Sequence, residues 1–254
     1  MAAIRDSSSR IPAPALLLAA LVVMLSASAP AMGGQEIIGS GIARSEARDP
    51  TGFHRIALSI HAKLDLRQDG SEGLTITGDD NIIALVETIV EDGTLTIRWK
   101  KGAYSTRYKD LGIVAHAKSI DGLAIAGSGE IAAKSLKAGK LRVSLAGSGR
   151  AAIDALNADA LNVNIEGSGD LALAGRIVSL DVSVAGSGRV SAAKLESQMA
   201  TVTVAGSGRA LLWATQALDA NVLGSGSVRY YGQPRVHSAI AGSGMVKQVS
   251  DRPG

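Results

Sequence analysis

Apolar and polar residues alternate in short runs along much of this chain, and one such pattern recurs at a fixed period. Between Leu123 and Val246 the tripeptide Gly-Ser-Gly occurs seven times, with successive gaps of 20, 20, 19, 20, 18 and 18 residues. Each copy follows an alternating run such as Leu141-Arg-Val-Ser-Leu145. A period of this length is typical of a solenoid, in which each repeat forms one rung.

Stacking the repeats on their glycines separates an aliphatic face from a polar one. Most residues six, four and two positions before each tripeptide are aliphatic, as in Leu161, Val163 and Ile165. The positions between them include Arg142, Ser144, Asn162, Asn164, Asp181, Ser183, Thr201 and Thr203. After the turn, one column holds Ile131, Ala151, Leu171, Val190, Ala210, Val228 and Val246. Because successive strand residues face opposite sides, we predict an all-β, single-stranded β-helix, or β-solenoid, with Gly-Ser-Gly corners and about 18–20 residues per rung.

The glycines of the tripeptides are predicted to be structural turns, because a sharp corner in every rung needs residues that tolerate positive φ or close backbone approach. They are Gly127, Gly129, Gly147, Gly149, Gly167, Gly169, Gly186, Gly188, Gly206, Gly208, Gly224, Gly226, Gly242 and Gly244. No copy continues into the Gly-Lys-Ser/Thr of a phosphate-binding loop or opens a Gly-x-Gly-x-x-Gly helix. We therefore expect corners rather than phosphate cradles.

Upstream of the repeats, residues 53–99 contain further strand-like runs, including Ile56-Ala-Leu-Ser-Ile60 and Leu95-Thr-Ile97. The segment from Asp79 to Val86 interrupts them and is compatible with a short helical turn. Residues 32–50 are rich in glycine and polar residues without periodicity, which predicts a flexible leader. We accordingly divide the chain into a signal peptide (1–31), this leader (32–50), a solenoid domain (51–249) and a tail (250–254).

The first residues have the pattern of a targeting segment. Arg5 and Arg10 precede an apolar run from Ala13 to Leu25, and Ala29-Pro30-Ala31 fits a signal-peptidase site. The run is shorter than the roughly 20 residues of a membrane-spanning helix, and we expect no transmembrane span in the mature chain. The alternative is a retained membrane anchor. The sequence predicts an exported protein, either periplasmic or secreted to the cell surface, and without cysteine it forms no disulfide.

Composition and candidate chemistry favour a non-enzymatic protein. The net charge of +3 is modest for 254 residues, so no nucleic-acid partner is expected. The four histidines lack metal-ligand spacing, and no Gly-x-Ser-x-Gly elbow is present, so we predict no catalytic residue, metal or cofactor. Glu130, Arg150, Asp170 and Arg189 follow successive tripeptides and are expected to form a column of alternating charge.

Residues 98–109 are the most distinctive departure from the repeat. This candidate surface-binding loop contains Arg98, Trp99, Lys100, Lys101, Tyr104, Arg107, Tyr108 and Lys109. Basic and aromatic side chains together bind polyanions through charge and ring stacking. The alternative is an exposed loop between two rungs, with lysines that serve solubility. Trp213 and the Tyr230-Tyr231 pair are expected to fill the late rungs.

The repeated L-x-V-x-I-x-Gly-Ser-Gly pattern, the Leu95-Thr-Ile97 strand and the closing motif from Gly224 to Pro234 resemble the family described as "putative auto-transporter adhesin, head GIN domain". The resemblance runs from about Phe53 to Val249 and implies an exported bacterial right-handed β-solenoid without established enzymatic activity. It supplies no catalytic residues.

We therefore expect an exported, non-enzymatic cell-envelope protein with a binding or structural, and by family adhesive, role. Its partner is expected to be a surface glycan or a protein ligand, and the sequence carries no signal for an oligomeric state. Two alternatives stay open: a polyanion-binding module that uses residues 98–109, and a carbohydrate-active enzyme. The second alternative requires paired carboxylates, whereas Asp181 and Asp219 are isolated among Ser, Thr, Asn and Ala.

Overall fold

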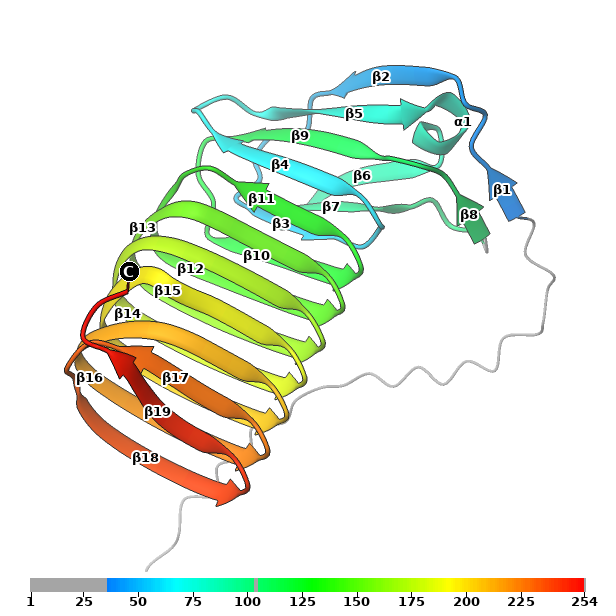
Figure 1. Ribbon diagram of the computed structural model, residues 1–254. Helices are drawn as coiled ribbons and strands as arrows, with labels where there is room; N and C mark the ends of the chain where they lie inside the picture. Colours follow the sequence, from blue (N-terminus) through cyan, green and yellow to red (C-terminus); the bar gives the residue numbers. More distant parts are fainter. Residues whose placement is uncertain (1–35, 103–104, 254) are drawn as a thin grey trace, which may run out of the picture. The chain divides into compact units, whose positions relative to one another are not determined.

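The structure, a computed structural model, describes residues 36–102 and 105–253, all of which belong to one compact unit (Figure 1). The predicted signal peptide and residue Tyr104 lie outside the described residues. The described strands are β1 (Glu36–Ile38), β2 (Ala43–Arg48), β3 (Arg55–Leu58), β4 (Lys63–Gln68), β5 (Gly73–Asp79), β6 (Val86–Glu91), β7 (Thr94–Trp99), β8 (Ser105–Arg107), β9 (Gly112–Ala117), β10 (Gly122–Gly127), β11 (Glu130–Ala133), β12 (Leu136–Gly147), β13 (Arg150–Gly167), β14 (Asp170–Gly186), β15 (Arg189–Gly206), β16 (Arg209–Gly224), β17 (Ser227–Tyr231), β18 (Arg235–Gly242) and β19 (Met245–Ser250). A single short helix, α1 (Asp80–Ile83), is found among these residues.

The repeats stack as parallel rungs, which confirms the predicted β-solenoid. β12 to β16 pair in order, and each tripeptide lies beside the next, as in Gly147↔Gly167↔Gly186. The return half of each rung is more regular than a loose connection, because β13 continues for 18 residues from one tripeptide to the next. Register shifts between neighbouring rungs, such as that between Ile153 and Leu156, mark places where the strand bends without leaving the ladder.

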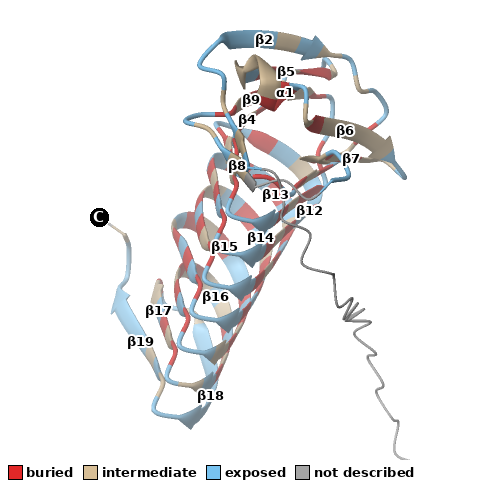
Figure 2. Cartoon of the chain, turned by 90° about the vertical axis from the view of Figure 1, so that its right-hand side faces the viewer, coloured by how far each residue is buried: buried red, intermediate tan, exposed pale blue. Residues whose placement is uncertain are grey.

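The aliphatic columns form the core, as their alternation predicts. Leu161, Val163 and Ile165 are buried, and the same positions of the rungs on either side are buried as well. The column after the turn is also buried from Ile131 to Val228. Figure 2 shows this alternation as red and blue segments along successive rungs. The interior is thus filled by small aliphatic side chains, consistent with the 3% aromatic content.

The corners require glycine for two reasons. The first glycine of every tripeptide has φ between 107° and 120°, a region that L side chains rarely adopt. At Gly167 a Cβ would also lie 2.8 Å from the carbonyl oxygen of Gly147 on the preceding rung. The second glycine is pressed against the core, since a Cβ on Gly188 would lie 2.6 Å from Cγ2 of Ile165. Between them, the Ser168 amide donates to the Gly147 carbonyl at 2.8 Å and links adjacent corners.

The N-terminal end departs from the parallel ladder. β3 pairs with β7 and β10, and β4 pairs with β9 and β11, so both continue the stack. Beyond them, β2–β5, β5–β9 and β6–β7 are antiparallel pairs. The helix α1, at the position where the sequence indicates a helical turn, places Ile82 and Ile83 fully in the core. An antiparallel sheet and a helix therefore close this end of the core (Figure 1).

The predicted flexible leader is wrong for its described part. β1 pairs with β8, and β2 pairs with β5 over six residues. β2 has the sequence Ala-Arg-Ser-Glu-Ala-Arg and contains no buried residue, so it lacks the apolar alternation that reveals a strand. Backbone pairing holds it in place, together with Arg48, whose guanidinium donates to the carbonyls of Ile83 and Val86.

Among the residues that the structure describes, no helix has the length and apolar character needed to cross a membrane.

Candidate binding groove

The outward face of the strands before each tripeptide carries two columns of polar or small residues. The first column contains Gly122, Arg142, Asn162, Asp181, Thr201 and Asp219, in register from β10 to β16. The second contains Ala124, Ser144, Asn164, Ser183, Thr203 and Asn221. Since parallel strands lie about 4.8 Å apart, the two columns present hydroxyl, amide and carboxylate groups at a regular spacing.

A groove of about 570 Å³ lies at the N-terminal end of this face. This volume falls within the range of small-ligand sites, although the groove is open to solvent. Its lining crosses β3, β7, β10, β12, β13 and β14 and consists of Arg55, Ile56, Ala57, Thr94, Asp121, Gly122, Leu123, Ala124, Lys140, Leu141, Arg142, Ser144, Ala160, Leu161, Asn162, Ser179 and Asp181. Residues that are far apart in the sequence meet here because β3 pairs with β10.

Gly122 keeps the groove shallow on the side of β3. It is buried, and a Cβ at this position would lie 2.8 Å from Cγ of Arg55, so the arginine side chain crosses the space that the glycine leaves. The Arg55 guanidinium donates to the backbone carbonyl of Asp92 in the β6–β7 turn. Arg55 is therefore anchored, and its charge lies at the edge of the groove.

Arg142, Asn162 and Asp181 occupy the first column on three successive strands. The Asn162 amide donates to Asp181 Oδ2 at 3.2 Å, which orients both side chains. Within the described residues, neither Arg142 nor the neighbouring Lys140 forms an ion pair, and both are exposed. The groove thus offers two unpaired cations beside a fixed amide–carboxylate pair.

The carboxylates of the groove are poorly placed for glycoside hydrolysis. Asp121 aligns with the rung of β10 and Asp181 with β14, three strand spacings away, so their backbones are about 14 Å apart. A hydrolytic pair requires a separation of about 5–9.5 Å. The arrangement is suited to hydrogen bonding with hydroxyl groups and to attraction of anionic groups.

The structure disperses the candidate loop 98–109. Arg98 and Trp99 belong to β7, where Arg98 Nε lies 2.8 Å from Glu87 Oε2 and Trp99 packs against the core. Tyr108 meets Trp99 edge-to-face with ring centroids 5.7 Å apart. The Tyr108 hydroxyl donates to the carbonyl of His61 at 2.6 Å, and burial raises the pKa of the phenol.

The remaining charges of this loop have different surroundings. Arg107 in β8 pairs with Glu36 at 3.1 Å, which fastens β8 to β1. Lys100, Lys101 and Lys109 are exposed. Trp99, Tyr108 and both arginines are therefore used within the fold, and three lysines face solvent.

The histidines lie in separate places. His61 Nδ1 is 3.2 Å from the hydroxyl of Ser128, the serine of the first tripeptide, and 3.1 Å from the Ser128 carbonyl. Among the described side chains no carboxylate bonds to His61, so this contact lacks the third member of a catalytic triad. His54 Nδ1 lies 2.9 Å from Asp121 Oδ2, at a different place on the surface.

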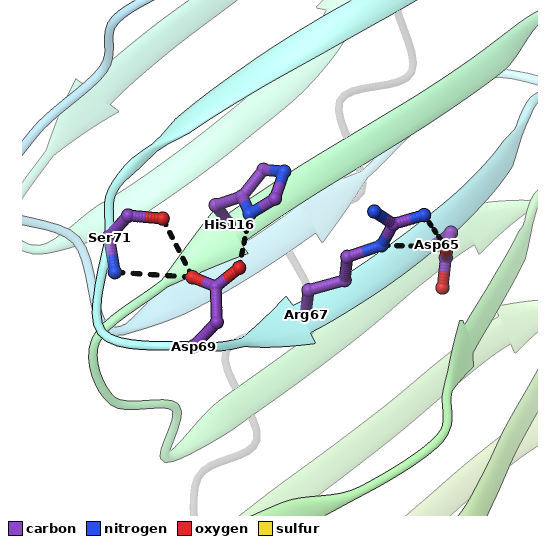
Figure 3. Close-up of polar contacts among 5 residues, drawn as sticks. All are labelled: Asp65, Arg67, Asp69, Ser71 and His116. Atoms are coloured by element: carbon purple, nitrogen blue, oxygen red, sulfur yellow. Dashed lines mark hydrogen bonds and ion pairs between the residues drawn. The ribbon is translucent and has the colours of Figure 1, made fainter.

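Asp69 forms a polar cluster in the turn after β4 (Figure 3). Its carboxylate accepts hydrogen bonds from the Ser71 hydroxyl at 2.7 Å and the Ser71 amide at 3.2 Å, and its other oxygen is 2.5 Å from His116 Nδ1. These bonds, with the Ser71 hydroxyl first, lower the pKa of Asp69 to about 2. On the same strand Arg67 pairs with Asp65 at 2.9 Å. The cluster closes a turn, and the described part of the chain contains no group of three potential metal-binding side chains.

The charge column after the tripeptides is present. Asp170 lies 3.7 Å from both Arg150 and Arg189, on the strands to either side. Glu130 is in register with Arg150. The sequence indicated this column, whereas it did not single out Arg55 or Lys140, whose role in the groove follows from the pairing of β3 with β10.

A family profile described as "putative auto-transporter adhesin, head GIN domain" matches residues 52–234. Among solved structures, a putative adhesin from Bacteroides fragilis is 27% identical with a TM-score of 0.80, covering 84% of this chain and 100% of its own. A protein from Parabacteroides distasonis described as a putative lipid binding protein is 26% identical with a TM-score of 0.73, covering 85% and 100%. A putative adhesin from the same species is 25% identical with a TM-score of 0.67, covering 85% and 100%. No match is found among curated protein sequences.

Proposed function

Because the chain belongs to the family of auto-transporter adhesin head GIN domains, we propose that it is an exported, non-enzymatic envelope protein that binds an acidic glycan through the groove between β3 and β14. The family and its solved relatives support a binding role at the cell envelope. Export is supported by the basic start, the apolar run and the Ala29-Pro30-Ala31 site of the sequence.

The unpaired cations of the groove are the reason for proposing an acidic ligand. Lys140 and Arg142 are exposed beside Asn162 and Asp181, and Arg55 adds a third positive charge at the edge. A planar guanidinium binds a carboxylate or sulfate with two hydrogen bonds. Amide and hydroxyl groups at a spacing of about 4.8 Å along the face supply partners for sugar hydroxyls. A polymer that carries both kinds of group matches this arrangement.

Two other functions have less support. For a carbohydrate-active enzyme, the backbones of Asp121 and Asp181 are about 14 Å apart, whereas the carboxyl groups of a hydrolytic pair lie about 5–9.5 Å apart. Asp181 and Asp219 lie two strands apart in one column, and Asp181 is hydrogen-bonded to Asn162. For polyanion binding through residues 98–109, Trp99 and Tyr108 are engaged with each other and with the core, and Arg98 and Arg107 form ion pairs. The described part of the loop therefore offers three lysines. Lys100→Ala/Lys101→Ala is a direct test of the second function, and we expect unchanged glycan binding.

Binding to immobilised acidic and neutral polysaccharides tests the proposal. We expect the wild-type protein to bind an acidic polymer and to lose affinity as salt rises, because charge attraction is screened. Lys140→Ala/Arg142→Ala is expected to lower this affinity by about 10-fold or more, since a hydrogen bond to a charged group contributes about 1.5–3 kcal/mol. Arg209→Ala, an exposed arginine after a later tripeptide, is the matched control and should leave affinity unchanged. Equal binding by the double variant would contradict the proposal.

Cell fractionation with protease treatment of intact cells tests export. We expect the protein outside the cytoplasm, cleaved near Met32. A full-length cytoplasmic protein would contradict this part of the proposal.

A further inference from the structure

The C-terminal end of the solenoid presents an open sheet edge. β18 pairs with β16 on one side, and the described residues provide no strand on its other side. Its inward column continues that of β16, yet Val236 and Ile240 are 42% and 45% exposed, whereas Leu218 and Val222 on β16 are each 1% exposed. Figure 2 shows β18 exposed along its whole length. Two core positions therefore lie uncovered beside a row of unpaired backbone groups.

On the opposite wall of the same rung, the inward positions are covered more fully. On β19, Val246 is partly buried against the core, and Gln248 Nε2 donates to the Gly232 carbonyl at 2.6 Å. Gln233 bonds to Asp251 at 2.9 Å and ties the following turn to the preceding rung. Among the described residues β19 is paired with β17 on one side only, so its backbone edge is open as well. β18 differs in that two aliphatic residues of its inward column, Val236 and Ile240, are exposed.

We propose that β18 pairs antiparallel with β18 of a second copy of this chain, about a two-fold axis at Ser238. Such an isologous contact uses one surface twice and satisfies the edge of both copies. With the axis at Ser238, Val236 of one copy lies opposite Ile240 of the other. In this register even-numbered residues of one copy lie opposite even-numbered residues of the other. Side chains that point into the core of one copy therefore lie beside side chains that point into the core of the other.

Charge and aliphatic contact together favour this register over its neighbours. With the axis at Ser238, Arg235 faces Ala241 of the other copy and His237 faces Ala239. An axis at Val236 would place Arg235 against His237, two basic groups, and would leave Ile240 without a partner. A shift by one residue would turn the aliphatic positions to solvent. An axis at Ala239 would also keep basic side chains apart, but it would place Val236 opposite Gly242 and Ile240 opposite Ser238. The Ser238 register is the one among these that sets the two aliphatic residues against each other.

The area of the end indicates a weak dimer. β18 has eight residues, so its edge is about 26 Å long at about 3.3 Å per residue. With the facing wall about 10 Å away, the end of one copy offers on the order of 260 Å² and the pair buries roughly 520 Å², well below the area of a standard specific complex. We therefore expect a weak equilibrium between monomer and dimer, with a dissociation constant on the order of 100 μM.

Pairing of two copies also affects the strength of glycan binding, a consequence that rests on the proposed function. A two-fold axis along the sheet normal leaves the outward faces of both copies on the same side, with a groove near each far end. Two sites on one polymer raise the apparent affinity without any new contact. Failure of glycan binding would leave the self-pairing itself intact.

Disulfide trapping tests the register. The chain contains no cysteine, and a two-fold axis at Ser238 places this residue opposite itself with Cα atoms about 4.5–5.5 Å apart, within reach of a disulfide. We expect Ser238→Cys to form a disulfide-linked dimer under mild oxidation. Ser243→Cys, in the last tripeptide on the same rung, is the matched control and should stay monomeric. No cross-link at Ser238, or equal cross-linking at Ser243, would overturn the register.

Sedimentation velocity over a concentration series tests the surface. Wild-type protein should shift from monomer to dimer over the micromolar range. Ile240→Lys, which places a charge on the paired edge, should raise the dissociation constant at least 10-fold while the folded monomer still binds acidic glycan. Val178→Lys, at an exposed position on β14, should dimerise as wild type does. A wild-type protein that remains monomeric at several hundred micromolar would overturn the proposal.

Discussion

The two ends of this solenoid differ in how far the core of the end rung is covered. Every interior rung buries its aliphatic column between two neighbours, and an end rung has only one. At the N-terminal end, antiparallel strands and α1 complete the core, so that Ile76, Ile82 and Ile83 have no exposed surface. At the C-terminal end, equivalent residues on β18 are nearly half exposed. The energetic contribution of a core residue therefore depends on its position along the stack more than on its type.

The largest expected effect is a substitution at a corner in the middle of the stack. In Gly186→Val, φ of +120° is strained for valine, and its Cβ would meet the Gly167 carbonyl oxygen at 2.5 Å. We expect a loss of about 3–5 kcal/mol in the free energy of unfolding, measured by urea denaturation. Gly242→Val meets the same geometry at the last rung, where β18 is held from one side only, and should cost less. Equal losses would contradict the difference between middle and end.

Truncation of core residues compares the two ends directly. Ile82→Ala removes a side chain with no exposure in α1, which should cost about 2–5 kcal/mol. Ile240→Ala removes a side chain that is 45% exposed and should cost about 1 kcal/mol or less at low protein concentration. Denaturation midpoints of the two variants measure this. A larger loss for Ile240→Ala would show that the C-terminal end is not open.

Arg48 tests how β2 is attached to the N-terminal end. Its guanidinium donates to the carbonyl of Val86 at 2.9 Å, to the Thr88 hydroxyl at 3.2 Å and to the Ile83 carbonyl at 3.3 Å. Arg48→Ala should destabilise the protein by about 1–3 kcal/mol, because partly buried acceptors lose their donor. Arg44→Ala, an exposed arginine on the same strand, is the control and should have little effect on the thermal midpoint.

The smallest expected effect is a dependence on pH at the turn after β4. The pKa of Asp69 is lowered to about 2 from an ordinary value of 3.8. A carboxyl with a depressed pKa stabilises the fold fully above its unfolded value, and this contribution is lost as the pH falls. Melting temperatures should therefore decline between pH 3.8 and 2 more steeply in wild type than in Asp69→Asn. Parallel curves would contradict the role of this turn.

Much of the fold could be predicted from the sequence. The spacing of the tripeptides indicates the length of a rung, and the apolar alternation before each tripeptide indicates which residues face the core. The columns that contain Leu161 and Ile131 are buried as the alternation indicates. β2 could not be predicted, since a strand without buried residues leaves no apolar pattern. The antiparallel strands that close the N-terminal end could not be predicted either, because these segments do not contain the Gly-Ser-Gly tripeptide.

The groove could likewise be predicted only in part. Its outward column from Arg142 to Asp181 follows from the stacking of the repeats. Arg55 joins it only because β3 pairs in register with β10 across a sequence separation that the repeat does not cover. Conversely, the basic and aromatic residues of 98–109 indicate a binding loop in the sequence, yet Trp99 and Tyr108 pack on each other. Composition alone does not distinguish a packed aromatic residue from an available one.

Hydrogen exchange of the backbone amides at two protein concentrations tests most directly whether the two ends differ as described. At a concentration well below the dimer equilibrium, the β18 amides that point away from β16 should exchange much faster than the amides of β5, which has a paired strand on both sides. At a concentration well above it, these β18 amides should become protected while those of β5 stay the same. Slow exchange of β18 at both concentrations would contradict an open C-terminal end, and fast exchange at both would contradict its pairing with a second copy.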